Sequence, residues 1–534
     1  MVYVPVRMRR VWVTIAAISA LCAGATSAVA HPERATQFPD ASKGAVPKYR
    51  QGGPAQVVCK TDSRARINRI YKGRSSRTLR RKRLRQLREC KFRHIQSAVD
   101  AAKNGDRILI MPGVYREEPS RAKPLDDPAC ASMFETPDDG DAPVATFEHQ
   151  VRCPNARNLI AVVGDSLEDP DSECDRKCNI QMEGMGRKPA DVLVEGDRLK
   201  KDVIRVDRAD GFFLRNVWVE QGAFNDVDVV ETNGFRLRKL VTPYGQHYGV
   251  LSFASDHGLY ELIEAYGNGD AGIYPGSGPE GHCQRYGIEI RGVDAHHNTQ
   301  GFSGTAGNGT WYRNSRFHHN NTGGSNDSFA SGHPGMPQDC SKWSNNEVYS
   351  NNENYFTDDR DAYCRNTPFE KRPKEIVCPQ FQVPVGTGFT LYGVNGNLVQ
   401  GNKIYDNWRS GVRLFYVPAS TRGETDPAKQ FDTSNGNKFV DNVMGDGPKG
   451  RLPNGIDFFW DEQGIDNCWR DNRAPGGQIT SDPANLPTCP QGSVFQQGNP
   501  AKSAAEVPCI SWDPNTNSDP PGCTWFTTPP KPSP

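Results

Sequence analysis

The chain has 534 residues, of which 64 are Lys or Arg and 63 are Asp or Glu, so its formal net charge at pH 7 is +1. Such a balance provides no global field that would recruit a charged partner, and the length fits either about three domains or one long solenoid. Fifteen cysteines, one of them in the first thirty residues, leave fourteen. This even number is typical of disulfides in an exported protein, although sequence alone does not give their pairing.

Residues 1–30 have the pattern of a secretory signal peptide. Three arginines open the segment, an apolar run follows from Val11 to Ala23, and Ala28-Val29-Ala30 forms a small-residue cleavage site. The apolar run is too short for a comfortable membrane span, and no later stretch is apolar enough for one. We therefore predict a secreted, extracellular protein that has no membrane contact once the signal is removed.

Residues 31–91 are predicted to form a basic and largely irregular arm. Between Lys60 and Arg93 the sequence has fifteen Lys or Arg residues and two acids, Asp62 and Glu89. Two interpretations stay open. The arm binds an anionic polymer (wall polymer, polyuronate or nucleic acid) through charge, or it is a solvated leader without a partner. Export makes nucleic acid the weakest of these partners, and we predict none.

Phe92 to Glu118 reads FRHIQSAVDAAKNGDRILIMPGVYREE. Its apolar residues from Ile95 to Ala102 fall on one helical face, Asn104-Gly105 ends the helix, and Ile108 to Met111 is a short strand. A helix of the form IQ-AVDAA followed by GD-I-I-PG-Y-E resembles the start of the right-handed parallel β-helix proteins of the pectin-lyase-like superfamily. The resemblance implies that this helix caps the open end of a solenoid and leads into its first rung.

The stretch from Tyr248 to Thr322 carries a repeat. Glycine-led strands return at Tyr248-Gly249-Val250, Ala271-Gly272-Ile273, Tyr286-Gly287-Ile288 and Gln300-Gly301-Phe302, and six-residue elements ending in Asn read IEAYGN, VDAHHN and SRFHHN. The last two of these elements are 22 residues apart, about one turn of a β-solenoid. We therefore predict an all-β fold, a right-handed parallel β-helix over residues 92–472, in which each rung packs on its neighbours.

Three segments outside the regular rungs are rich in Pro and Cys. Between the cap and the rungs, Pro119 to Cys153 and Gly164 to Lys188 are predicted to be long loops held by disulfides. Residues 473–534 form a Pro/Gly/Cys-rich C-terminal tail, which we expect to cover the other end of the solenoid. Loops on a rigid solenoid can form the walls of a binding groove, or they can be without function.

The glycine-led strands predict an outward-facing strip of side chains, because successive residues of a strand point to opposite faces. We place these strands in one ladder and predict six substrate-binding residues: Arg205, Arg238, Phe253, Asp270, Tyr392 and Arg413. Such a strip matches a linear glycan, since arginines pair bidentately with uronate carboxylates and aromatic rings stack on sugars. A solvated sheet face of mixed charge is the alternative.

The Asn-ended elements predict a second outward ladder. It contains Tyr266, His296, His318 and Tyr349, with His296 and His318 one rung apart. Stacked histidines could bind a metal, but no carboxylate or cysteine with ligand spacing accompanies them. We therefore predict no metal site at these histidines.

Cleavage of a polyuronate by β-elimination requires a group that neutralises the carboxylate and a base that removes the adjacent proton. Arg236 or Arg291, or a bound calcium ion, could neutralise the carboxylate, and Tyr274 could transfer the proton. Hydrolysis instead requires two carboxylates about 5 to 9.5 Å apart, for which Glu289 with Asp270 or Asp294 is the candidate pair. The predicted catalytic residues are Arg236, Tyr274, Glu289 and Arg291, and calcium is the one cofactor we consider.

The motifs of the characterised enzymes of this superfamily are absent. The sequence has no complete polygalacturonase set, no DPHD sequence of the alginate epimerases and no WIDH sequence of the pectate lyases. Two hypotheses therefore stand. In the first, a monomeric exported β-helix binds an acidic polysaccharide or cell-wall polymer and, if catalytic, cleaves it by elimination. In the second, a non-catalytic surface or wall-associated β-helix uses its ladders as a binding or structural face.

Overall fold

We describe a computed structural model of the chain over residues 33–136, 143–168, 173–328, 333–417, 434–494, 498–510, 512–514 and 520–533. The predicted signal peptide lies outside these residues. Within these ranges, no helix combines the length and the apolar character that crossing a bilayer requires.

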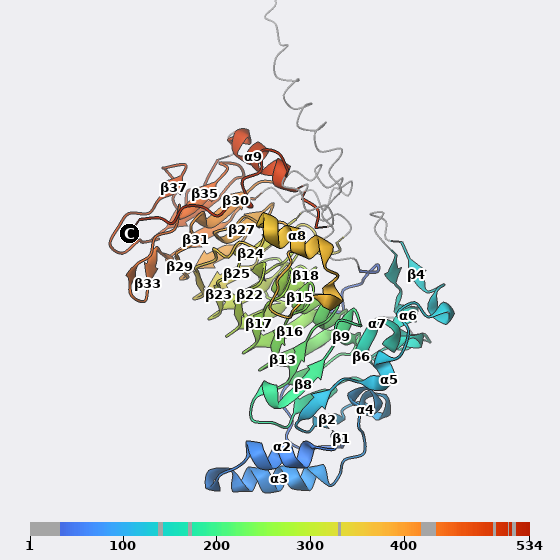
Figure 1. Ribbon diagram of the computed structural model, residues 1–534. Coiled ribbons are helices and arrows are strands. Elements are labelled where there is room, and N and C mark those ends of the chain that lie inside the picture. Colours follow the sequence, from blue (N-terminus) through green and yellow to red (C-terminus); the bar gives the residue numbers. More distant parts are fainter. Residues whose placement is uncertain are drawn as a thin grey trace, which may run out of the picture.

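Three long parallel sheets, which we call sheets I, II and III, build the body of the molecule (Figure 1). Each regular rung adds one strand to every sheet, so neighbours in a sheet are one rung apart in sequence. Sheet I consists of β1 (Ala55–Val58), β2 (Arg107–Ile110), β7 (Gln181–Gly184), β10 (Phe212–Arg215), β13 (Asn233–Arg238), β16 (Asp256–Glu261), β19 (Ile288–Arg291), β22 (Thr310–Arg313), β25 (Lys342–Ser344), β28 (Leu398–Gln400), β31 (Lys438–Val440) and β36 (Cys468–Arg470).

The other two sheets have the same rung order. Sheet II consists of β3 (Gly113–Tyr115), β8 (Val192–Glu195), β11 (Trp218–Glu220), β14 (Val241–Pro243), β17 (Glu264–Tyr266), β20 (Asp294–His296), β23 (Arg316–His318), β26 (Glu347–Tyr349), β29 (Lys403–Tyr405) and β32 (Val443–Met444). Sheet III consists of β6 (Asn158–Val163), β9 (Asp202–Asp207), β12 (Asn225–Val230), β15 (Tyr248–Phe253), β18 (Ala271–Gly276), β21 (Gln300–Phe302), β24 (Thr322–Asp327), β27 (Thr387–Tyr392), β30 (Ser410–Phe415), β35 (Phe458–Trp460) and β37 (Ser481–Asp482).

Helices and short hairpins lie outside these sheets. The α-helices are α2 (Ser63–Ile70), α3 (Arg77–Leu87), α4 (Ile95–Ala101), α5 (Glu118–Arg121), α6 (Phe147–Arg152), α7 (Pro154–Arg157), α8 (Asp358–Asn366) and α9 (Pro500–Ile510). Short 3₁₀ turns cover Arg74–Ser76, Pro128–Cys130, Pro189–Asp191 and Phe369–Lys371, and two antiparallel hairpins pair β4 (Phe134–Glu135) with β5 (Val144–Ala145) and β33 (Asp446–Gly447) with β34 (Gly450–Arg451).

One apolar core runs along the inside of the coil. Inward side chains from adjacent rungs stack on each other, as Val250, Ile273 and Phe302 do in sheet III, and all three are fully buried. At the turn from sheet II to sheet III, the side-chain amide of Asn298 donates to Asn320 at 3.1 Å, and that of Asn320 donates to Asn351 at 3.0 Å. The chain is thus a right-handed parallel β-helix, as the repeat predicted.

The N-terminal cap has the predicted helix and strand. Ile95 and Val99 of α4 are buried in the main core, and β2 follows the helix. The carboxylate of Glu117 accepts hydrogen bonds from the backbone N–H groups of Ile95 and Gln96, both at 2.8 Å. These bonds satisfy two N–H groups that have no acceptor within the helix, and they fix α4 on the open end of the solenoid.

Residues 31–91, the predicted basic arm, are partly regular in the structure. They contain β1, α2 and α3. Helix α2 packs on the outer face of sheet I through the buried Ile67 and the following Tyr71, and α3 adds the partly buried Leu84 and Leu87. The segment has few apolar residues among its many basic ones, so the sequence shows no clear packing face. These few apolar residues are nevertheless enough to pack it on the sheet.

Seven disulfides pair the fourteen cysteines that the structure describes: Cys59–Cys90, Cys130–Cys153, Cys174–Cys178, Cys283–Cys340, Cys364–Cys378, Cys468–Cys489 and Cys509–Cys523. Cys130–Cys153 and Cys364–Cys378 each close a loop, Cys509–Cys523 closes part of the tail, and Cys468–Cys489 joins the tail to strand β36. The C-terminal tail covers more than the solenoid end. Its Trp512 and Trp525 pack with Tyr392 and Phe415 on the outer face of sheet III.

Candidate functional site

Two rows of outward side chains run along sheet I. The strand register places Arg236 beside Leu259 and Arg238 beside Glu261, and the next strand adds Glu289 and Arg291. We call the outward surface from β10 to β25 the arginine face, with the charged and aromatic residues Arg215, Arg236, Arg238, Glu261, Glu289, Arg291, Trp311, Arg313 and Lys342.

Glu261 lies at the centre of this face and binds three arginines. Arg236 donates to its Oε2 at 2.6 Å, the Nε of Arg238 lies 2.7 Å from the same oxygen, and Arg291 donates to Oε1 at 2.9 Å. Burial alone would raise the pKa of Glu261, but the hydrogen bond and charge of Arg236, joined by the other two guanidiniums, lower it. The carboxylate therefore stays charged and holds the three guanidinium groups together at the surface.

A second carboxylate, Glu289, extends the network by one strand. Its Oε1 accepts from Arg313 Nε at 2.7 Å and from Arg291 Nη1 at 3.4 Å. The arginines keep solvent access, since the side chains of Arg238 and Arg291 are 32% and 33% exposed. A guanidinium has five N–H donors, so donors remain for a ligand beyond these internal bonds.

Aromatic rings lie among the cations. The guanidinium carbon of Arg313 is 4.4 Å from the Trp311 ring centroid, and Lys342 Nζ approaches the same ring at 5.4 Å. Tyr286 flanks this tryptophan, with ring centroids 5.6 Å apart. The half-exposed indole provides an apolar surface beside charged donors. A sugar acid has the complementary groups, an apolar ring face and a carboxylate.

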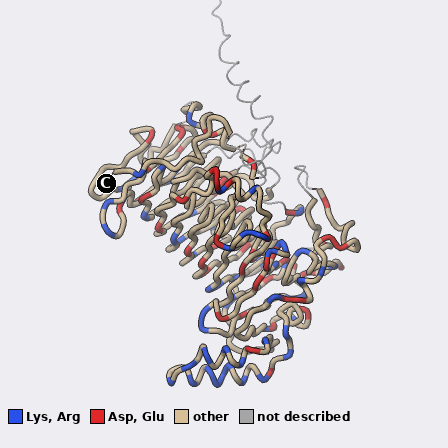
Figure 2. The backbone as a smooth tube through the Cα atoms, in the orientation of Figure 1, with Lys and Arg blue, Asp and Glu red and all other residues tan. Residues whose placement is uncertain are grey.

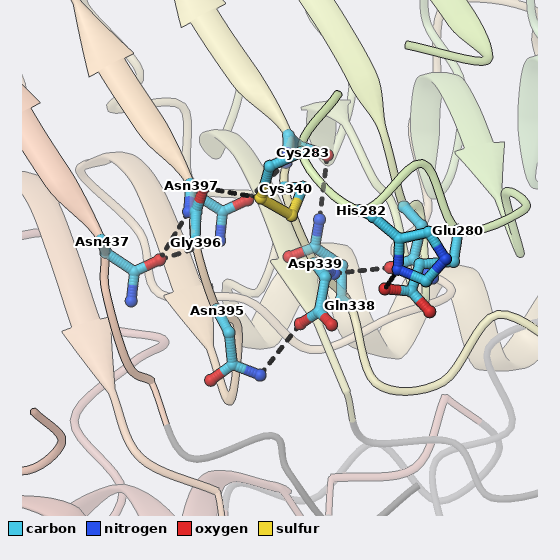
Figure 3. The surroundings of a disulfide bond; sticks show 12 residues. Glu280, His282, Cys283, Gln338, Asp339, Cys340, Asn395, Gly396, Asn397 and Asn437 are labelled. Carbon is cyan, nitrogen blue, oxygen red and sulfur yellow. Dashed lines mark hydrogen bonds and ion pairs between the residues drawn. A yellow bond between two sulfur atoms is a disulfide. The ribbon is translucent and has the colours of Figure 1, made fainter. Parts of the chain in front are cut away.

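A disulfide supports the loop that presents Tyr286 (Figure 3). Cys283 in the loop after β18 is bonded to Cys340 in the loop after β24. Close to this bond, Asn395 donates to Asp339 at 2.9 Å, and Asn397 donates to Asn437 of the next rung at 2.9 Å. The turns from sheet III to sheet I are thereby tied across rungs, and they form a fixed edge of the arginine face.

The arginine face has six cations and two carboxylates, which leaves four positive charges in excess. The sequence analysis missed Arg215, Glu261, Trp311, Arg313 and Lys342. The rung period could have found them, since Arg215, Arg238 and Glu261 follow each other at intervals of 23 residues.

The outer face of sheet III differs, because its charges are buried and paired. Arg205 binds Asp228 at 2.6 Å and Asp207 at 3.1 Å, and Arg34 from the N-terminal segment donates to Asp207 at 2.8 Å and also binds Glu231. Burial alone would raise the pKa of Asp207, but Arg34 and Arg205 outweigh it and lower the pKa to about 2.

A second buried group on sheet III joins tyrosines and carboxylates. Asp270 accepts hydrogen bonds from Tyr248 and, at 3.1 Å, from Gln300, and the rings of Tyr248 and Tyr274 lie 4.8 Å apart. Burial raises the pKa of Asp270 to about 7, against the opposing effect of these hydrogen bonds. A carboxyl group with such a pKa can both accept and donate a proton near neutral pH.

Sheet II has the predicted second ladder. Tyr266, His296, His318, Tyr349 and Tyr405 occupy one row, and their rings stack at centroid distances of 5.2, 5.3, 4.7 and 5.0 Å. Across all residues that the structure describes, no group of three or more His, Cys, Asp or Glu side chains is arranged to hold a metal ion.

The predicted single ladder is wrong, because its residues lie in two sheets. Arg236, Arg238, Glu289 and Arg291 are in sheet I, whereas Arg205, Phe253, Tyr274, Tyr392 and Arg413 are in sheet III and Asp270 directly precedes the sheet III strand β18. Both sheets contain glycine-led strands of similar pattern. Two such strands of one rung therefore look like the same strand of two successive rungs. Tyr392 and Arg413 are also covered by the tail, where Arg413 donates to Glu506 of α9 at 2.7 Å.

This separation changes the chemical hypotheses. The predicted base Tyr274 is buried on sheet III, so it does not share a surface with Arg236 or Arg291. The candidate hydrolytic pairs are also divided, since Glu289 is in sheet I, Asp294 in sheet II and Asp270 beside sheet III. The predicted catalytic groups are therefore not assembled in one place.

No family model and no curated protein matches this chain. Similar solved structures include the A-module of a mannuronan C-5 epimerase from Azotobacter vinelandii, with a TM-score of 0.41 and 12% identity over 72% of this chain and 91% of that one. A pectate lyase has a TM-score of 0.34 and 12% identity over 83% and 84% of the two chains. DFA-IIIase from Arthrobacter chlorophenolicus A6 has a TM-score of 0.42 and 9% identity over 72% and 82%. These similarities are similarities of fold.

Proposed function

We propose that this protein is an exported β-helix that binds an acidic polysaccharide along the arginine face. The observation that carries the proposal is the excess of cations over carboxylates in two partly exposed rows whose members are one strand apart. Adjacent strands are about 4.8 Å apart, a distance comparable to one sugar unit. A linear polyuronate can therefore meet cations from β10, β13, β19, β22 and β25, whereas β16 presents Leu259 and Glu261.

The chemistry of the face favours a carboxylated glycan. Glu261 and Glu289 hold the arginines in place, so little conformational entropy is lost when the guanidiniums bind a ligand carboxylate. The planar guanidinium matches a carboxylate bidentately, and Trp311 offers a ring face for a sugar. Because the cations are exposed, the binding should weaken steeply with salt.

The test is the affinity for a tetramer of galacturonate, measured by calorimetry. The double variant Arg238→Gln/Arg291→Gln should lower the affinity about tenfold, since each exposed charge pair contributes up to about 1 kcal/mol. The matched control Arg316→Gln/Lys403→Gln removes two exposed cations from sheet II and should bind like the wild type. Equal losses in the two variants, or no loss in either, would contradict the proposed location.

A second candidate function is catalysis at the buried group on sheet III. The specific observation is the Asp270 carboxyl group, whose pKa lies at about 7 beside Tyr248 and Tyr274. These groups could exchange a proton with a bound sugar once the substrate reaches them. The assay is the absorbance of unsaturated uronide during incubation with a panel of polyuronates, with and without calcium. No absorbance change and no new reducing ends would leave binding as the function.

A further inference from the structure

The α2–α3 hairpin, residues 60–93, is folded and packs on sheet I. Tyr71 at the end of α2 is buried with Leu109 and Met185 of the sheet, and its hydroxyl donates to the Met185 carbonyl at 3.0 Å. The Cys59–Cys90 disulfide closes the base of the hairpin. The hairpin is therefore held on the coil by buried side chains and closed by a disulfide. The alternative of a solvated leader without contacts does not apply to it.

The hairpin has far more cations than carboxylates to pair with them. Fifteen Lys or Arg residues and two acids lie between residues 60 and 93. Within the described parts of the chain, only Lys60 and Arg66 of these fifteen form an ion pair, with Glu118 and Asp62. No residue of α3 is buried. Crowded cations repel each other, so an unneutralised cluster is a cost to folding unless a polyanion binds there.

The cations of α3 are ordered in a row. Arg77, Arg81, Arg85 and Arg88 follow at intervals of four, four and three residues, which places them along one side of the helix. All four are exposed. Figure 2 shows Lys and Arg along the whole of this helix, whereas positive and negative residues alternate over the coil. The row spans about 16 Å, since each helical residue rises about 1.5 Å.

The strands on which the hairpin packs are next to the arginine face. The hairpin packs on β1, β2 and the end of β7, and the arginine face begins at β10, the next strand of sheet I. We propose that the α2–α3 hairpin is a second binding surface for the acidic polysaccharide, continuous with the arginine face. This inference rests on the proposed function. Strands about 4.8 Å apart place β1 and β25 about 38 Å apart, so an oligomer that reaches from the hairpin to the far end of the arginine face must be long.

The test compares a galacturonate tetramer with a dodecamer. The triple variant Arg77→Gln/Arg81→Gln/Arg85→Gln should lower the affinity for the dodecamer about tenfold at low salt and leave the tetramer unchanged. It should also reduce the slope of log affinity against log salt, because fewer counterions are exchanged. The substituted side chains are exposed, and an unchanged unfolding temperature confirms that the variant is folded.

The outcomes separate the two proposals. If the triple variant binds both oligomers like the wild type while Arg238→Gln/Arg291→Gln still loses the tetramer, the hairpin proposal is overturned and the arginine face stands. If only the hairpin variant loses affinity, the hairpin binds polyanions and the proposed function at the arginine face fails. Equal losses for tetramer and dodecamer would overturn a continuous surface. Tighter hairpin-dependent binding of single-stranded DNA or of anionic lipid vesicles than of the dodecamer would overturn the class of ligand.

Discussion

The outer faces of sheets I and III both present arginines and carboxylates on neighbouring strands, yet they differ in coverage and balance. On sheet III, Arg34 and Arg205 are buried and bind carboxylates on several sides. On sheet I, Arg238 and Arg291 share one carboxylate and are about a third exposed. The same residue type therefore stabilises the fold where it is buried and remains available for a ligand where it is not.

The largest effect that the comparison predicts is on stability at sheet III. Arg205→Ala leaves Asp207 and Asp228 buried without their shared partner, and it should lower the free energy of unfolding by about 3–5 kcal/mol. Guanidinium unfolding measures the change. Arg291→Ala on sheet I serves as the matched control and should cost less than about 1 kcal/mol. Similar losses at both positions would remove the distinction between the faces.

The next effect is a dependence on pH. The pKa of Asp270 is about 7 in the folded protein and about 4 in the unfolded chain, so between these values the folded state binds more protons. Stability should therefore fall as the pH rises from 4 to 7 and then level off. Asp270→Asn should remove this fall and stabilise the protein at pH 8 by up to about 4 kcal/mol.

Thermal unfolding at pH 5 and pH 8 measures that difference. The control is Asp471→Asn, at a side chain that is 68% exposed, which should change neither temperature. If wild type and Asp270→Asn show the same difference between the two pH values, the buried carboxyl group does not control the effect.

A smaller effect, an increase in ligand affinity, is expected from a substitution at the centre of the arginine face. Glu261→Gln removes one of the two carboxylates and raises the positive excess by one charge. The affinity for a galacturonate tetramer should increase about two- to fivefold, because three guanidiniums lose their internal partner and are free for the ligand. Calorimetry with the tetramer tests this sign. A loss of affinity would contradict this prediction and mean that the lost ordering of the arginines outweighs the gain in positive charge.

The smallest effect is expected on sheet II. Arg316→Gln removes an exposed ion pair with Asp294 and should change the free energy of unfolding by about 0.5 kcal/mol or less. It should leave polyuronate binding unchanged in the same assay. A clear loss of binding in this variant would move the ligand from sheet I to sheet II.

The fold was predictable because local sequence patterns that repeat along the chain determine it. The terminal Asn of SRFHHN, Asn320, bonds to its equivalents one rung away, and the helix from Ile95 caps the coil as expected. The residues of the second ladder were also placed correctly, since His296 and His318 are partners in adjacent strands. These features depend on the period of the chain and on the alternation of side chains along a strand.

The arginine face was only partly predictable. The sequence placed Arg236, Arg238, Glu289 and Arg291 on an outward strip, but it did not indicate Glu261, which binds three arginines. The sequence pattern does not state which sheet a glycine-led strand joins. A strand with an inward Val or Ile and an outward charged residue fits sheet I and sheet III equally well.

The sequence by itself determined that this chain coils into a β-helix and that its strands point charged and aromatic residues outward. Only the tertiary structure decided which outward residues meet solvent. That decision comes from segments distant in the chain, since Arg34 lies against Asp207 and Trp525 against Tyr392 on sheet III, whereas Arg238 and Arg291 of sheet I keep solvent access. Burial is set by such long-range packing, and local periodicity carries no information about it.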